Sequence, residues 1–155
     1  MLMKVLLGNK IQRIDLPTLH LSEKSRRSII GLFAGSQIFR VLLSADMADV
    51  SEVFRHFLNK ESFAPGIQCV QLIVDSAESQ LLDLLTACSF QKHSPTVSNY
   101  YSRVHPHDDS KLIEVGWEFL TRGRFMHIEI LLSSGEESVI DEFGQYAQFL
   151  MYDVD

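Results

Sequence analysis

The densest group of polar, reactive side chains in the sequence surrounds Pro106. His105, His107 and Asp109 stand within five residues of one another. Imidazole nitrogens and carboxylate oxygens are groups that bind divalent metal ions, so these three residues form a candidate metal site. The alternative is a surface turn shaped by Pro106, in which Asp108 or Asp109 caps the helix that is expected to follow.

Two further groups of polar residues fall in strand-like stretches. His127 and Glu129 are separated by one residue, and alternation along a strand would place both side chains on the same face. There they would form either a site or an ordinary cross-strand pair that is exposed or partly covered. Tyr100 and Tyr101 are adjacent, so their side chains would point to opposite faces. We expect one of them in the core and the other at a pocket.

The sequence lacks the motifs that identify several large enzyme classes. It contains no G-x-x-x-x-G-K-[ST] phosphate loop, no G-x-G-x-x-G after a strand and no G-x-S-x-G nucleophile turn. It also contains no C-x-x-C and no H-E-x-x-H metal motif. P-loop phosphoryl transfer and standard dinucleotide binding therefore have no support.

Composition and charge indicate a globular domain and narrow its partners. The 155 residues are 46% hydrophobic and 22% charged, close to the values of ordinary globular proteins. The formal net charge of −6 argues against non-specific nucleic-acid binding, which needs a basic surface. No apolar run approaches the roughly 18 residues of a membrane span. We therefore expect neither a nucleic-acid partner nor a membrane partner.

The first residues and the cysteines bear on location. The apolar stretch 1–7 is too short for a secretory signal, and we expect it to be the first strand. Cys69 and Cys88 occupy apolar positions, where small buried thiols are expected rather than a disulfide. Together these features predict a reducing, cytoplasmic location.

Strand-like and helix-like segments alternate along the chain. Strands are expected where apolar residues alternate or run together, at residues 1–7, 11–16, 37–44, 69–74, 100–104 and 125–132. Helices are expected where apolar residues recur every three or four positions, at residues 22–35, 49–58, 77–88, 110–122 and 134–150. The polar stretch between the third helix and the fifth strand, 91–99, indicates a loop or an irregular edge.

Several helix ends are predicted from single residues. Asp49 is a plausible cap for its helix, and Asp75 with Glu78 resembles a capping box. The helix 110–122 is expected to end at Gly123. Its buried side would consist of Ile113, Trp117 and Leu120.

The order of elements predicts an α/β fold, with α+β as the alternative. A central, mixed sheet flanked by helices is expected, in one domain over residues 1–155. The one plausible seam lies at residues 104–109. A single domain is preferred because the residues beyond this seam are few for an independent core.

Residues 67–104 carry a specific order of elements. An apolar strand, Cys69-Val-Gln-Leu-Ile-Val-Asp75, is followed by a helix, a Ser89-Phe90 turn and the strand Tyr100-Tyr101-Ser-Arg103. With the amphipathic helix before it, this order resembles the GNAT family of N-acetyltransferases over about residues 45–104. The resemblance implies a GNAT-like arrangement, acetyl-CoA as a possible cofactor, and Tyr100 or Tyr101 as the candidate catalytic acid.

The cofactor motif of that family is not present. GNAT proteins hold the coenzyme A pyrophosphate on main-chain N–H groups of an [RQ]-x-x-G-x-[GA] loop at a helix N-terminus. The corresponding residues here contain no glycine and two carboxylates, Asp46 and Asp49, which would repel a phosphate. Leu85 stands where the family often has a tyrosine that serves as general acid. Glu78 stands near the position where the family often has an asparagine.

Three functions are compatible with these observations. The first is a diverged or non-catalytic, acetyltransferase-like binding or regulatory protein that acts through a protein partner or through self-association, for example as a homodimer. The second is an active acyl-CoA-dependent N-acyltransferase with a divergent cofactor loop. The third is a metal-dependent site at His105, His107 and Asp109.

Overall fold

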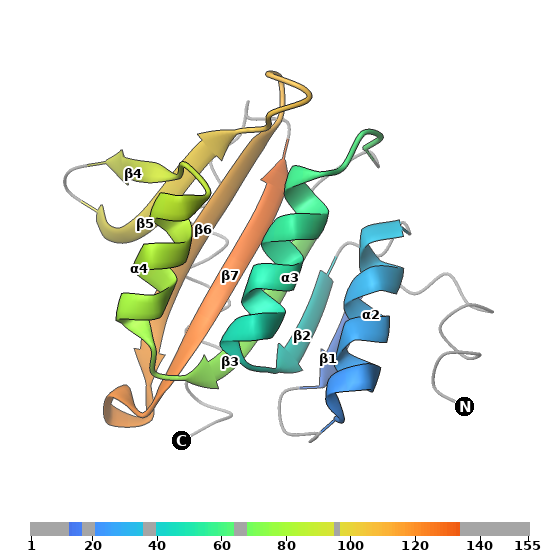
Figure 1. Ribbon diagram of the computed structural model, residues 1–155. Coiled ribbons are helices and arrows are strands. Elements are labelled where there is room, and N and C mark those ends of the chain that lie inside the picture. Colours follow the sequence, from blue (N-terminus) through green and yellow to red (C-terminus); the bar gives the residue numbers. More distant parts are fainter. Residues whose placement is uncertain (1–12, 17–20, 36–39, 64–67, 95–96, 134–155) are drawn as a thin grey trace.

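Seven strands and three helices make up the part of the chain that the computed structural model describes, residues 13–16, 21–35, 40–63, 68–94 and 97–133 (Figure 1). In chain order they are β1 (Arg13–Leu16), α2 (Glu23–Gly35), β2 (Arg40–Ser44), α3 (Met47–Leu58), β3 (Gln68–Asp75), α4 (Glu78–Ala87), β4 (Gln91–Ser94), β5 (Val97–Val104), β6 (Leu112–Leu120) and β7 (Phe125–Ser133). A short 3-10 turn, η1 (Thr121–Gly123), joins β6 to β7.

The strands form one mixed sheet in the order β1-β2-β3-β7-β6-β5-β4. β1, β2 and β3 are parallel, and a parallel pair needs a crossover connection, which α2 and α3 provide. From β3 onward, every neighbouring pair is antiparallel. The predicted α/β class with a central, mixed sheet is confirmed.

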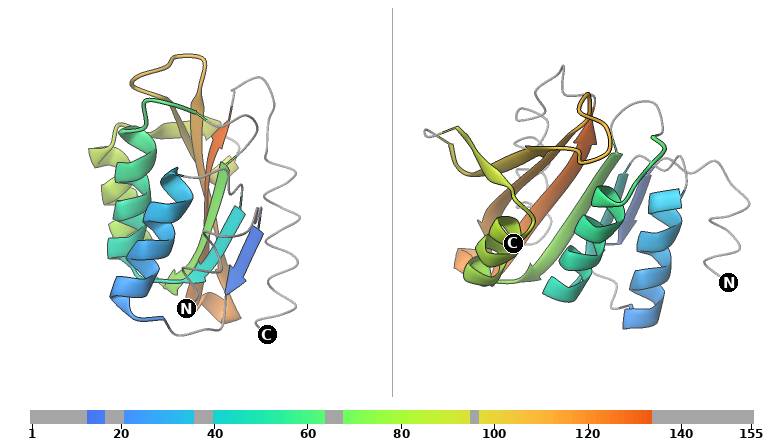
Figure 2. Two further views of the ribbon diagram at one scale, coloured as in Figure 1. Left: turned by 90° about the vertical axis from the view of Figure 1, so that its right-hand side faces the viewer. Right: turned by 45° about the horizontal axis from the view of Figure 1, so that its top comes forward.

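The helices α2, α3 and α4 lie together on one face of the sheet (Figure 2). The sequence of α3 explains its place at the centre of this layer. Val50, Val53, Phe54 and Phe57 recur at helical spacing, and each is at most 1% exposed. They join one hydrophobic core with the alternate residues of β3, β6 and β7 that face the helices. This core therefore lies between the helices and the sheet.

The opposite face of the central strands is buried as well. On β2, Val41 and Leu43 join the core under the helices, while Leu42, on the other face, is only 3% exposed. Residues 68–74 of β3 are buried without a break. Strands that are covered on both faces are expected to be apolar throughout, which makes any polar residue on the second face notable.

The predicted helix 110–122 is wrong, because this segment forms β6. Ile113 and Trp117 are four residues apart, a spacing that puts them on one face of a helix and also on one face of a strand. Val115 completes the row, and Leu120 falls on the other face. Pairing with β5 on one side and β7 on the other gives both edges of the segment main-chain hydrogen-bond partners, which decides for the strand.

Gly123 ends a tight connection and not a helix. Its φ is +88°, in the left-handed region that glycine adopts at little cost, and it is the last residue of η1. The next residue, Arg124, donates its main-chain N–H to the carbonyl of Thr121 at 3.2 Å. The chain thereby reverses directly from β6 into β7.

The cap of α3 is Asp46 rather than the predicted Asp49. Asp46 Oδ1 accepts a hydrogen bond from the Asp49 N–H at 2.9 Å, and Asp49 Oδ2 accepts one from the Asp46 N–H at 3.0 Å. The two residues therefore form a reciprocal capping box with Asp49 as the third helical residue. The prediction named Asp49 alone and therefore placed the cap three residues too late.

The predicted capping box at α4 is not formed. Asp75 is the last residue of β3, and Ala77, which precedes the helix, makes no side-chain cap bond. Glu78 Oε2 instead accepts a hydrogen bond from the indole Nε1 of Trp117 at 2.9 Å. This bond ties the start of α4 to β6.

Replacing Glu78 by alanine is expected to lower the free energy of unfolding by about 1–2 kcal/mol, because the buried indole N–H of Trp117 loses its acceptor. Glu78→Gln keeps an acceptor oxygen and should lose less than half as much. Trp117 is the single tryptophan of the chain, so its fluorescence during urea unfolding reports directly on this region. Equal losses in the two variants would show that the bond does not contribute.

Other predictions concern the edges of the described part. The strand 1–7 and the helix 134–150 lie outside the described residues. β4 is an edge strand with a register shift between Lys92 and Ser94, in agreement with the predicted irregular edge. The segment 104–109 connects β5 and β6, which pair directly with each other. None of the described helices has the length and apolarity needed to cross a membrane.

Candidate functional site

The sheet face opposite the three helices carries buried polar side chains. We call this set the polar face and define it by five residues from β3, β5, β6 and β7: Gln71, Tyr100, Glu114, His127 and Glu129. Each is at most 6% exposed. Burying a polar group costs free energy unless the group forms hydrogen bonds. The hydrogen-bond partners of these five side chains therefore have to be accounted for.

The strand register places four residues in one row: Tyr100, Gly116, Glu129 and Gln71. Gly116 stands between the tyrosine and the glutamate in this row and is itself buried. Glu114 precedes Gly116 by two residues on the same face of β6, diagonal to Tyr100. Long side chains interact across such a diagonal.

Glu114 is the most unusual residue of the polar face. It is 1% exposed, and neither of its carboxylate oxygens has a hydrogen-bond partner among the described residues. Burial raises the pKa of Glu114 to about 7, because the charged form is poorly solvated there. Tyr100, 2% exposed, has a hydroxyl with no partner in the described part of the chain either. Its ring lies edge-on to His93, with the centroids 4.6 Å apart.

His127 and Glu129 share a face, as the alternation predicted. The expectation of an exposed or partly covered pair is wrong, since both residues are 0% exposed. Burial lowers the pKa of His127 to about 4, so its imidazole is neutral at pH 7. Cys69 of β3 donates a hydrogen bond from Sγ to Glu129 Oε1 of β7 at 3.4 Å, which links these two strands within the polar face.

Tyr100 and Tyr101 lie on opposite faces of the sheet. Tyr101 belongs to the helix side, where it stacks on Trp117 with ring centroids 5.6 Å apart and packs against the core. Tyr100 belongs to the polar face. Of the two candidate acids, only Tyr100 therefore stands among other titratable side chains.

An open groove of about 400 Å³ lies beside the polar face, and we call it the β4 groove. It is lined by Ser89, Gln91, Lys92, Ser102, Arg103, Val104 and Leu112. The lining combines two cations with apolar surface, since Val104 is 50% exposed. Sequence reasoning missed this groove, because its residues come from the turn after α4 and from three different strands.

The geometry connects the groove to the polar face. Ser102 is the cross-strand partner of Glu114, and Leu112 precedes Glu114 by two residues on the same face of β6. Arg103 is held in place by hydrogen bonds to the carbonyls of Cys88 at 2.6 Å and Val104 at 3.0 Å. The groove therefore has a basic rim, and two of its lining residues, Ser102 and Leu112, are neighbours of Glu114 in the sheet.

The structure gives the three candidate metal ligands separate environments. His105 is buried, and its Nδ1 accepts the His107 N–H at 3.0 Å while its Nε2 lies 2.6 Å from the carbonyl oxygen of Phe57. Both ring nitrogens are thus bonded to main-chain groups, with the proton on Nε2. His107 and Asp109 are exposed. Nowhere in the described ranges do three or more His, Cys, Asp or Glu residues form a group that could hold a metal ion.

Replacing His105 by alanine is expected to cost about 2 kcal/mol or more of unfolding free energy. The variant loses two hydrogen bonds, one from the His107 N–H and one to the carbonyl of Phe57. The exposed neighbour provides the control, because His107→Ala should change stability by less than about 0.5 kcal/mol. Urea unfolding measures both. A similar loss in the two variants would mean that His105 does not tie the β5–β6 connection to the end of α3.

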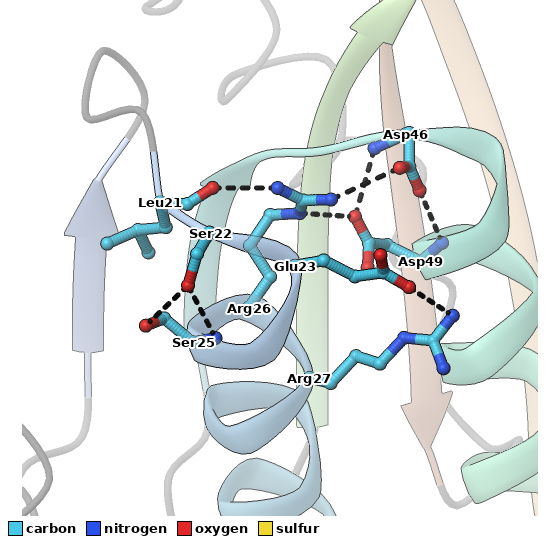
Figure 3. A network of polar contacts seen from close by, with 8 residues as sticks. All are labelled: Leu21, Ser22, Glu23, Ser25, Arg26, Arg27, Asp46 and Asp49. Atoms are coloured by element: carbon cyan, nitrogen blue, oxygen red, sulfur yellow. Dashed lines mark hydrogen bonds and ion pairs between the residues drawn. The ribbon is translucent and has the colours of Figure 1, made fainter.

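A second polar cluster closes the N-terminus of α3 (Figure 3). Arg26 of α2 donates from Nε to Asp49 Oδ2 at 2.7 Å and from Nη2 to Asp46 Oδ2 at 3.1 Å. Its Nη1 donates to the carbonyl of Leu21 at 2.7 Å. One guanidinium therefore joins the start of α2 to both carboxylates of the capping box.

The charges of this cluster are matched to each other. Burial raises the pKa of Asp49, and hydrogen bonds and the charge of Arg26 oppose that rise. For Asp46, burial acts in the same direction, but the hydrogen bonds from Asp49 outweigh it and lower the pKa. The positive N-terminal end of α3 and the guanidinium of Arg26 are thus both bonded to the carboxylates of Asp46 and Asp49.

Comparison of the chain with protein-family models, with curated proteins and with solved structures found no match. The fold and the site therefore define the protein by themselves. It is a mixed α/β domain with its described helices on one face, buried polar residues on the other, and a groove at one edge of the sheet.

Proposed function

We propose that this chain is a non-catalytic binding domain that recognises an extended segment of a protein partner at the β4 groove. The observation that carries the proposal is the groove itself, an open depression at an edge strand with basic, polar and apolar lining. Extended peptides commonly bind by adding a strand to a sheet edge, and side-chain pockets beside that edge give specificity.

The properties of β4 fit such a partner. β4 is the last strand of the described sheet and has only four residues, so its outer main-chain groups offer a short template. Lys92 and Arg103 make the rim basic in a chain whose net charge is −6. Acidic side chains of the partner would therefore be attracted to this rim.

The α3 N-terminus speaks against the acyltransferase alternative. A coenzyme A pyrophosphate would need the main-chain N–H groups that the capping box of Asp46 and Asp49 uses. It would also face two carboxylates whose nearest cation, Arg26, is already engaged. The residues that would have to bind the cofactor thus form a structural link between two helices.

The test is selection of binders from a displayed library of random twelve-residue peptides, followed by affinity measurement. We expect enrichment of extended, acidic sequences whose Kd rises at least about tenfold in Lys92→Glu, which reverses the charge of the rim. Lys24→Glu, the same charge change on the exposed side of α2, is the matched control and should leave the affinity unchanged.

Two other outcomes would overturn the proposal. The first is no enriched peptide together with concentration-dependent dimers in sedimentation, which would assign the function to self-association. The second is a rise of several degrees in the melting temperature with millimolar acetyl-CoA, which would favour the enzyme, because a ligand that binds only the native state stabilises it.

A further inference from the structure

The β4 groove presents positive charge and hydrogen-bond donors without a carboxylate. Its polar lining consists of two cations, two hydroxyl groups and one amide, carried by Lys92, Arg103, Ser89, Ser102 and Gln91. Among the described residues no aspartate or glutamate lines it, although acidic residues outnumber lysine and arginine by 20 to 14 in the whole chain. The groove is therefore suited to an anion.

The guanidinium of Arg103 is held in place but keeps its charge. On α2, Arg26 and Arg27 each form an ion pair with a carboxylate. Arg103 has no such pair in the described part of the chain, and its Nη1 and Nε donate to the carbonyls of Cys88 and Val104. A neutral carbonyl orients a guanidinium without compensating its charge. The Nη2 group forms no hydrogen bond with a described residue, so it can donate to a ligand.

Lys92 adds a second positive charge on the same face of the sheet. It pairs across the strands with Tyr101, and Arg103 follows Tyr101 by two residues, so the two cations are diagonal neighbours. Lys92 is exposed and forms no ion pair with the described residues. Glu114 lies on the opposite face of the sheet. Two like charges repel each other, and a bound anion would relieve that repulsion.

A serine in a left-handed conformation lines the same groove. α4 ends in a Schellman motif, in which the N–H of Phe90 donates to the carbonyl of Leu85 at 2.9 Å and the N–H of Ser89 donates to that of Thr86 at 3.1 Å. Ser89 therefore stands where glycine is usual, with a φ of +65°. A residue with a side chain adopts this conformation at a cost in free energy that glycine avoids. A use for the Ser89 hydroxyl in the groove would account for this cost.

We propose that the β4 groove binds a phosphoryl group on the partner segment, through the guanidinium of Arg103 and the ammonium of Lys92, with the hydroxyl of Ser89 as a further donor. The inference rests on the proposed function and specifies the acidic group that the groove selects. A phosphorylated side chain carries a charge of about −1.5 to −2 at pH 7 and three acceptor oxygens. A carboxylate carries one charge and two oxygens, so it would match only part of this donor set.

The test compares peptides that differ in one group. In the acidic peptides selected on the full chain, each acidic residue is replaced in turn by phosphoserine, phosphothreonine or phosphotyrosine. We expect one such replacement to lower Kd at least about tenfold. Arg103→Lys keeps the charge but loses the planar donor group. It should raise the Kd of the phosphopeptide at least about tenfold and that of the unphosphorylated peptide about threefold or less.

Two variants separate binding from folding. Ser89→Gly removes the left-handed serine, so it should raise the melting temperature by about 2–4 °C and yet raise the Kd of the phosphopeptide about threefold. Lys92→Gln changes an exposed side chain and should raise this Kd about fivefold. Lys24→Gln, the same substitution at an exposed position of α2, is the matched control and should leave the Kd unchanged.

Each outcome bears on one of the two proposals. Peptides that bind equally well with a carboxylate and with a phosphoryl group would overturn the inference and leave the proposed function standing. Tighter binding of a phosphopeptide that is insensitive to Lys92→Gln and Ser89→Gly would also overturn the inference, because the phosphoryl group would then be bound elsewhere. The absence of any binding peptide, both in the displayed library and in a random library with a fixed central phosphoserine, would overturn both.

Discussion

Replacing Arg26 by methionine is expected to lower the free energy of unfolding by about 3 kcal/mol. The substitution leaves Asp49, 0% exposed, as a buried carboxylate without its cation. It also removes the hydrogen bond to the carbonyl of Leu21, and with it the link between the starts of α2 and α3. Methionine keeps most of the aliphatic length, so the loss reports the polar contacts more than packing.

The neighbouring arginine provides a matched control. Arg27 forms an exposed ion pair with Glu23 one turn earlier on α2, and Arg27→Met should cost less than about 0.5 kcal/mol. The double variant Arg26→Met/Asp49→Asn should recover part of the loss, because it removes the uncompensated charge together with its partner. Urea unfolding of the four proteins measures the coupling. Strict additivity of Arg26→Met and Asp49→Asn would contradict a direct interaction.

The second large effect is a dependence of stability on pH that arises from Glu114. Its pKa is about 7 in the folded protein against 4.5 for an ordinary glutamate, so the folded state holds this proton more tightly than the unfolded state. The contribution of Glu114 to stability is therefore lost as the pH rises from 4.5 to 7. A shift of this size corresponds to about 3 kcal/mol.

The measurement is the difference in unfolding free energy between Glu114→Gln and the wild type. We expect the variant to gain about 3 kcal/mol relative to the wild type between pH 4.5 and pH 8, with most of the gain before pH 7. Taking the difference cancels the titration of all other groups. If the difference in unfolding free energy between Glu114→Gln and the wild type stayed constant across this range, the pKa of Glu114 would not be raised in the folded protein.

The titration of His127 changes the unfolding free energy with pH in the opposite direction to that of Glu114. The pH dependence of the wild type alone is therefore a poor test of the Glu114 effect. Its pKa is about 4 in the folded state against an ordinary value of 6.5, so the unfolded state binds the proton more readily. The corresponding stability is lost as the pH falls from 6.5 to 4. Between pH 4.5 and 6.5 the two residues nearly cancel, and only the Glu114→Gln variant exposes the slope of His127.

Local sequence patterns predicted most of the elements correctly. Val50, Val53, Phe54 and Phe57 recur at a spacing that only a helix turns into one continuous face, so α3 was identified from its own residues. β3 and β7 were identified in the same way, from runs of apolar residues too short for helices. The alternation of His127 and Glu129 correctly placed both side chains on one face.

The tertiary structure decided what local patterns leave open. Ile113 and Trp117 fit a helix and a strand equally, and only the neighbours β5 and β7, which supply main-chain hydrogen bonds on both edges, made the segment β6. The complete burial of His127 and Glu129 is a property of the folded chain that their spacing in the sequence does not encode.

The candidate site was decided in the same way. Tyr100 was a candidate from the sequence, whereas Glu114 was not, because its segment was expected to be a helix with Ile113, Trp117 and Leu120 on the buried side. These two residues, together with Gly116 and Ser102, come together only through the register of β5 on β6. Residue types and local periods are properties of short segments, and the sequence by itself determined those. Strand order, register and the burial of a charged group are properties of contacts between segments, and only the folded chain determined them.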